Sequence, residues 1–132
     1  MRLGLAGRLG IWLAVLGTAC AAGQGAKPPR IYPAAFLSPE ATFQTWIDAA
    51  TQGDAVRIRE CYFPGLSPEE LDAWVDNHLR PEAAALFAGA RLLQVVPVSP
   101  VEASFRFSGS SGAAEYRGVM VRSSTGWKIL RW

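Results

Sequence analysis

The chain has 132 residues, of which 50% are hydrophobic, and it carries 13 Lys and Arg residues against 11 Asp and Glu residues. Two of the basic residues, Arg2 and Arg8, precede Cys20, so the chain from Cys20 onward holds 11 basic and 11 acidic residues. A nucleic-acid-binding protein needs a basic face to displace counterions from phosphates, and this balanced chain without a run of Lys and Arg excludes that class of partner.

The N-terminal segment has the layout of a secretory signal. It has a basic start, an apolar run from Leu9 to about Ala19, and small residues after the run. The apolar run is about half of the ~20 residues that a membrane-spanning helix needs. We therefore predict a signal peptide over residues 1–19 and export of the rest of the chain.

The end of that run, Leu16-Gly17-Thr18-Ala19-Cys20, resembles the bacterial lipoprotein box. The resemblance implies cleavage before Cys20 and a triacylated cysteine, which anchors the protein to a membrane of the cell envelope, because several acyl chains hold firmly where one binds marginally. The alternative is cleavage after Ala19, Ala21 or Ala22, which gives a secreted or periplasmic soluble protein. Residues 20–37 contain Gly and several prolines without a periodic pattern, and we interpret them as a tether.

Residues 38–132 suit one small domain, and its first part has helical periodicity. Ser38 is a good N-cap and Pro39 suits the first helical position, while Gly53 can end the helix and Asp54 can cap a second one. Residues at i, i+3, i+4 and i+7 predict a buried stripe on the first helix: Phe43, Trp46, Ile47 and Ala50. The inward residues expected on the second helix are Val56, Cys61 and Tyr62.

A third helix starts with a capping box formed by Ser67 and Glu70. Leu71, Trp74, Val75 and His78 continue it at helical spacing, and Pro81 ends it. A short Ala-rich segment over residues 81–88 is expected to be helical, with Gly89 closing it.

From Ala90 the period changes to two, which predicts four strands at about 90–98, 101–108, 113–123 and 127–132. The short connections force antiparallel neighbours. We therefore predict an α+β fold in which N-terminal helices pack on one face of a curved four-stranded antiparallel sheet. Pro97 indicates that the first strand is an edge strand or already ends there, Gly118 suggests a bulge, and Trp132 is expected on an interface face with Lys128 and Leu130.

The order of these elements, the segment WIDAA at 46–50 followed by Gly53-Asp54, and the closing GWKIL at 126–130 resemble the nuclear transport factor 2-like superfamily, which includes ketosteroid isomerase and scytalone dehydratase. The resemblance implies a cystatin-like cone with a pocket at its wide end and a homodimer through the outer face of the sheet. It also implies that a catalytic member uses an Asp or His inside the pocket.

His78 is the single histidine and the named candidate for a catalytic base, beside an unidentified pocket acid. It falls on the apolar side of its helix without an acidic neighbour on the same face, so the simpler interpretation is a core histidine that donates to a carbonyl. Cys61 is interpreted as a small buried hydrophobe. One His and one Cys cannot complete a tetrahedral metal site, and the sequence indicates no cofactor.

Several aromatic residues can line an apolar pocket, with core filling as the alternative. The pocket-lining candidates are Trp46, Tyr62, Trp74, His78 and Tyr116. The sequence favours a membrane-tethered, non-enzymatic envelope domain that binds a small apolar ligand or a protein partner. The alternative is an enzyme of isomerase or dehydratase type that uses a pocket acid or His78.

Overall fold

The structure is a computed structural model that describes residues 32–132. The predicted signal peptide 1–19, the lipidation site Cys20 and residues 20–31 of the predicted tether lie outside the described residues. Within the described part, no helix is both long enough and apolar enough to cross a membrane.

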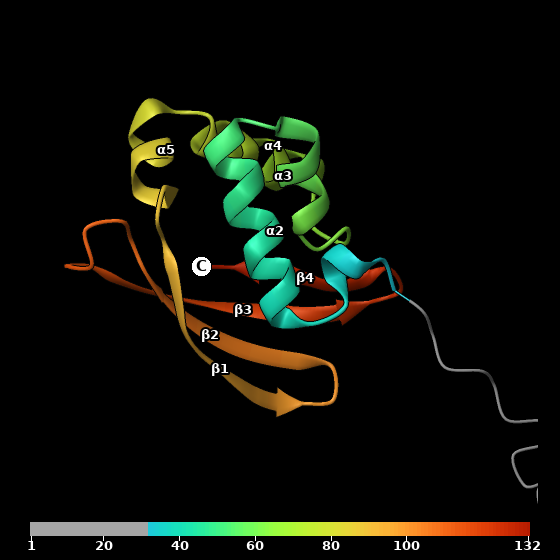
Figure 1. Cartoon of the computed structure of the whole chain (residues 1–132). Helices are drawn as coiled ribbons and strands as arrows, with labels where there is room; N and C mark the ends of the chain where they lie inside the picture. Colours follow the sequence, from blue (N-terminus) through green and yellow to red (C-terminus); the bar gives the residue numbers. More distant parts are fainter. Residues whose placement is uncertain (1–31) are drawn as a thin grey trace, which may run out of the picture. The chain divides into compact units, whose positions relative to one another are not determined.

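Helices precede strands along the chain, and the helices lie on one face of a curved sheet (Figure 1). The helical elements are η3 (Ala34–Phe36), α2 (Pro39–Gln52), α3 (Ala55–Cys61), α4 (Pro68–His78) and α5 (Pro81–Phe87). The strands are β1 (Arg91–Ser99), β2 (Glu102–Ser108), β3 (Glu115–Ser123) and β4 (Gly126–Arg131), in the spatial order β1-β2-β3-β4 with antiparallel neighbours. The predicted α+β fold class is confirmed.

The ends of α2 follow from residues at the helix boundary. The Ser38 hydroxyl accepts a hydrogen bond of 3.1 Å from the Ala41 amide, and Gly53 takes the left-handed conformation with φ of 69°. The Asp54 carboxylate then accepts from the Arg57 amide and caps α3. These local predictions from sequence are confirmed.

The predicted stripe of α2 is buried against the sheet, and it includes Phe43, Trp46 and Ile47. Each such large apolar side chain contributes about 1.5–3 kcal/mol on burial. The Thr42 hydroxyl, which is also buried, donates a 2.8 Å hydrogen bond to the Trp127 carbonyl. This bond ties the first turn of α2 to β4.

The orientation of α3 corrects one prediction from sequence. Val56, expected to face inward, has 73% of its surface exposed, whereas Ile58 is fully buried beside Cys61 and Tyr62. Residues 58, 61 and 62 have the spacing of one helix face, and residue 56 lies about 200° away from residue 58. The Asp54 cap starts the helix so that Ile58 faces the core.

Helix α4 starts with the predicted capping box, in which the Ser67 hydroxyl and the Glu70 side chain bond each other's backbone amides. His78, in its last turn, is buried with 1% of its surface exposed. Helix α5 buries Phe87, and Gly89 follows it with φ of 81°. Helices α4 and α5 together close one end of the core.

The inner face of the sheet carries Phe105 and Phe107 from β2, both buried. Strand β1, which contains Pro97, lies at an edge as predicted. The register shift in β3 falls between Val119 and Met120, one residue beyond the predicted bulge at Gly118. A Cβ at Gly118 would lie 2.6 Å from both the Phe105 ring and the Arg131 carbonyl oxygen, so this position requires glycine.

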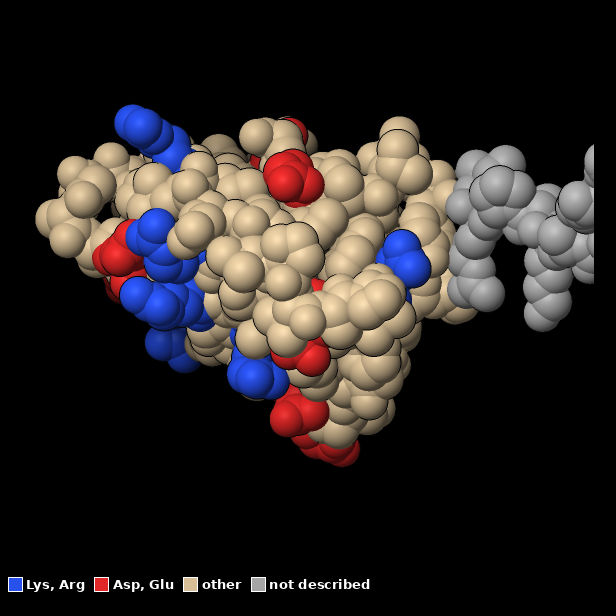
Figure 2. All heavy atoms as spheres, turned by 90° about the horizontal axis from the view of Figure 1, so that it is seen from below, with Lys and Arg blue, Asp and Glu red and all other residues tan. Residues whose placement is uncertain are grey.

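The outer face of the sheet is more polar, and Figure 2 shows Lys and Arg side chains gathered over one part of it. Arg106 of β2 is the cross-strand partner of Arg117 of β3. Arg106 also donates to the Gln94 side chain and pairs with the Glu115 carboxylate. These polar contacts lie on the side of the sheet away from the helices.

Candidate functional site

Six aromatic side chains from separate elements meet between the helices and the sheet, and we call them the aromatic hub. Its members are Trp46 of α2, Tyr62 after α3, Trp74 and His78 of α4, Phe87 of α5, and Trp132 after β4. The Trp46 and Trp132 ring centroids are 5.4 Å apart, and His78 stacks on Phe87 at 5.0 Å. Four of the five predicted pocket-lining residues therefore gather in one place.

Hydrogen bonds fix the protonation state of His78. The Trp46 Nε1–H donates to His78 Nε2 at 2.8 Å. Since an indole N–H can only donate, Nε2 must accept, and the proton of a neutral imidazole is then on Nδ1. From there it is donated to the Trp74 carbonyl at 2.6 Å. Burial lowers the pKa of His78, and the bond to the Trp74 carbonyl opposes this only in part.

Tyr62 extends the network toward the end of β4. Its hydroxyl accepts from Trp132 Nε1 at 2.7 Å and donates toward His78 Nε2 at 3.2 Å. Burial raises the pKa of Tyr62 well above its ordinary value, so the phenol keeps its proton. The hub is thus a neutral network in which two indoles, a phenol and an imidazole satisfy one another.

This arrangement has consequences for the catalytic candidate. Both ring nitrogens of His78 already have protein partners, and the side chain has 1% of its surface exposed. A general base must reach the proton that it removes from a substrate. In this structure His78 has the geometry of a core histidine that donates to a carbonyl, which is the simpler of the two interpretations of the sequence.

The other candidate nucleophile is also enclosed. Cys61 is fully buried, and burial raises the pKa of its thiol to about 12. A thiol with such a pKa is protonated and unreactive at neutral pH. Among residues 32–132, no group of three or more His, Cys, Asp and Glu side chains has the arrangement of a metal site.

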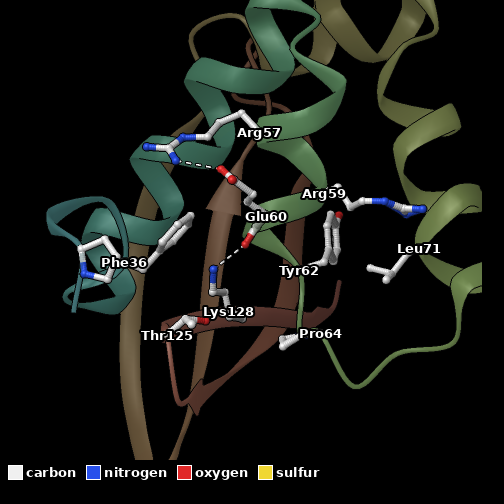
Figure 3. Close-up of a pocket in the computed structure, with 10 residues that line it drawn as sticks. Phe36, Arg57, Arg59, Glu60, Tyr62, Pro64, Leu71, Thr125 and Lys128 are labelled. Carbon is white, nitrogen blue, oxygen red and sulfur yellow. Dashed lines mark hydrogen bonds and ion pairs between the residues drawn. The ribbon is translucent and has the colours of Figure 1, made fainter. Parts of the chain in front are cut away.

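A groove of about 500 Å³ opens on the surface beside α3 and β4 (Figure 3). It is formed by side chains from η3, α3, the start of α4, the β3–β4 turn and β4. The lining residues are Pro33, Phe36, Arg57, Arg59, Glu60, Tyr62, Pro64, Leu71, Thr125 and Lys128. Tyr62 belongs to both the hub and the groove, whereas the other pocket-lining candidates (Trp46, Trp74, His78 and Tyr116) are not among the lining residues of the groove.

Lys128 is the most unusual residue of the groove. Its side chain points toward the backbone of α3 (Figure 3), and Nζ donates to the Glu60 carbonyl at 2.6 Å. Nζ also lies 3.4 Å from the centroid of the Phe36 ring, in a cation–π contact. Only 5% of the residue is exposed, and this burial lowers the pKa of Lys128.

The remaining charges of the groove are paired. Arg57 binds the Glu60 carboxylate at 2.8 Å, and Arg59 pairs with Asp72 at the rim. Across the residues that the structure describes, the ion pairs leave Lys128 without a carboxylate partner. The groove therefore combines an apolar lining with one recessed, unpaired ammonium.

Sequence reasoning missed both Phe36 and Lys128 as site residues. Phe36 lies within the segment interpreted as a tether, yet in η3 it is buried against the domain. Lys128 was expected on an interface face with Trp132, which instead packs in the hub. One signal was available, because Lys128 is the single lysine after residue 27 and stands between Trp127 and Ile129 in a predicted strand.

The chain was compared with protein families, curated proteins and solved structures. No protein-family model and no curated protein matches the sequence. Among solved structures, a ketosteroid isomerase-like protein from Erwinia carotovora atroseptica SCRI1043 is 14% identical, covers 68% of this chain and 86% of its own, and has a TM-score of 0.43.

An NTF-2-like protein of unknown function from Shewanella oneidensis MR-1 is 15% identical, covers 67% of this chain and 88% of its own, and has a TM-score of 0.42. At these identities the likeness concerns the fold alone.

Proposed function

We propose that the domain is a non-enzymatic binding module that takes a small apolar ligand in the groove, and that a lipid on Cys20 tethers it to a membrane of the cell envelope. The observation that carries the binding proposal is the groove itself. Its volume of about 500 Å³ lies within the range of roughly 300–1,000 Å³ that is usual for small-molecule sites.

The lining supports an apolar ligand. Pro33, Pro64 and the half-buried Leu71 present apolar surface at the groove, and the buried rings of Phe36 and Tyr62 also belong to its lining. Ligand sites typically combine such a lining with a few polar groups that fix orientation. The groove has this composition.

The state of the hub supports a role without catalysis. The polar atoms of Trp46, Tyr62 and His78 are engaged with one another in the core. Using His78 as a base would require breaking these bonds and opening the core to substrate. An isomerase or dehydratase activity therefore has less support than binding.

The binding proposal is tested with N-phenylnaphthylamine, a neutral apolar dye whose fluorescence rises in apolar sites. We expect saturable binding to the full chain. Thr125→Trp fills the groove from its exposed rim and should weaken binding by at least about tenfold, whereas Ser124→Trp, at a neighbouring exposed position outside the lining, should leave it unchanged. Equal affinities of the two variants, or no saturable binding, would refute the groove as the ligand site.

The tether is tested by intact-mass measurement of protein extracted from membranes of an expressing bacterium. We expect a mature N-terminus at Cys20 with the added mass of three acyl chains, and release of the Cys20→Ala variant from the membrane fraction. An unmodified N-terminus, or a Cys20→Ala variant that stays membrane-bound, would contradict lipidation.

A further inference from the structure

We propose that the ligand of the groove is an amphipathic monoanion, an apolar chain or ring bearing one carboxylate, and that Lys128 recognises the carboxylate. This inference rests on the proposed function and narrows it to a chemical class. It starts from the contacts that Lys128 makes and from those that it lacks.

The ammonium group of Lys128 has donors to spare. A lysine ammonium carries three N–H donors, and one of them is used by the Glu60 carbonyl at 2.6 Å. The Phe36 ring covers a second side at 3.4 Å. Because Lys128 also lines the groove, a ligand oxygen in the groove can accept from an N–H that the protein does not use.

Charge complementarity favours an anion. Arg57 and Arg59 are each matched by a carboxylate, from Glu60 and Asp72 respectively, while the ion pairs of the described chain include none for Lys128. A buried ammonium costs free energy unless it is paired. A bound carboxylate would supply the missing partner, and this gain is specific to an anion.

The rest of the groove requires an apolar body. Inorganic phosphate or acetate would reach Lys128 but would leave Leu71 and the two prolines in water. The ammonium is also recessed, with 5% of the residue exposed, so a flat acidic protein surface cannot approach it closely. A slender molecule with the anion at one end satisfies both parts of the lining.

The proposal is tested by displacement of N-phenylnaphthylamine from the full chain with three ligands that share a ten-carbon chain: decanoate, decanol and decylammonium. We expect decanoate to bind at least about tenfold more tightly than decanol, and decylammonium to bind most weakly. Lys128→Met keeps an unbranched side chain without charge, and it should reduce decanoate to the affinity of decanol while changing decanol by less than about twofold.

Arg80→Met serves as the matched control, because Arg80 is exposed and outside the lining of the groove. It should keep the preference for decanoate. If Arg80→Met removes the preference equally, general surface charge explains it and the assignment of Lys128 fails. Millimolar phosphate should not displace decanoate, and displacement would overturn the need for an apolar body.

A second measurement does not depend on the folding of Lys128→Met. Lys27→Arg leaves Lys128 as the single lysine, so growth on lysine labelled with ¹³C at Cε gives it one NMR signal that reports its titration. Bound decanoate should shift the titration of this signal to higher pH, because a nearby anion stabilises the charged amine. Decanol should not shift it, and an equal effect of the two ligands would refute the contact.

The outcomes separate the two proposals. Equal binding of decanoate and decanol by the native chain would refute recognition of an anion while leaving an apolar binding groove. Failure of the dye and of all three ligands to bind would refute both. A preference for decanoate that survives Lys128→Met would place the anion elsewhere and overturn the inference.

Discussion

Trp46 Nε1 and His78 Nε2 lie 2.8 Å apart, and this contact joins α2 to α4 in the centre of the core. Because the indole can only donate, the contact excludes a proton on Nε2. Protonation of His78 would therefore break the bond and place a charge among aromatic rings. The stability of the domain should depend on the neutral state of this imidazole.

The first prediction concerns pH. Since the pKa of His78 is lowered from 6.5 in the native state, the unfolded chain binds this proton at a higher pH than the folded one. The contribution of His78 to the free energy of unfolding is therefore complete above about pH 6.5 and falls as the pH drops toward the native pKa, by at most about 1.4 kcal/mol per pH unit.

Urea unfolding between pH 7.5 and 5 measures this dependence, and ¹⁵N NMR of the single histidine measures its native pKa and tautomer directly. The Nδ1–H form should persist below pH 6.5. An imidazole that titrates at or above 6.5 in the folded protein would contradict the prediction.

The second prediction concerns the Tyr62 hydroxyl. Tyr62→Phe leaves the Trp132 indole N–H without its acceptor, and a buried donor without a partner costs about 1–3 kcal/mol. Tyr116 is a half-buried tyrosine that packs against the core beside the hub. Tyr116→Phe removes the same hydroxyl group and should cost less than about 0.5 kcal/mol. Chemical denaturation followed by circular dichroism gives both values, and equal losses would argue against the network.

The third prediction concerns Gly118. A Cβ there would approach the Phe105 ring and the Arg131 carbonyl oxygen to 2.6 Å, so Gly118→Ala must displace a core side chain and a strand backbone. We expect a loss of about 1–3 kcal/mol or more. Gly112→Ala is the comparison, because its φ of 73° costs about 1–2 kcal/mol in open space. A shift of β3 and β4 cross-peaks in NMR spectra of Gly118→Ala alone would identify the steric cause.

The fourth prediction concerns the start of α4. Ser67→Ala removes the hydroxyl that accepts from the Glu70 amide at 3.1 Å, and it should lower the free energy of unfolding by about 0.5–2 kcal/mol. Ser67→Asp restores an acceptor and should recover most of the loss. Failure of Ser67→Asp to recover stability would point to a role of Ser67 other than capping.

The features that sequence predicts well depend on neighbours in the chain. Ser38, Gly53 and Ser67 act on amides or carbonyls within a few residues, so composition and spacing identify their roles. The alternation of Phe105 and Phe107 likewise reports one face of a strand. These local rules determine the helices, the strands and their antiparallel order.

The candidate site depends on contacts between distant residues, and the same rules miss it. The acceptor of Lys128 is a carbonyl 68 residues earlier in the chain. Trp132 follows the end of β4, where strand alternation no longer governs the side chain, and it packs against Trp46 rather than on an interface. Only the assembled domain brings Phe36, Glu60 and Lys128 together.

The burial of Cys61 makes its thiol a probe of local opening of the domain. Because Cys61 is fully buried, an alkylating reagent reaches its thiol only when the structure around α3 opens, so in a Cys20→Ala chain the rate of alkylation at saturating reagent reports the frequency of that opening. Occupation of the adjacent groove should slow the reaction, since Arg57 and Glu60 of the same helix line it. The rate of Cys61 alkylation thereby reports whether a ligand occupies the groove.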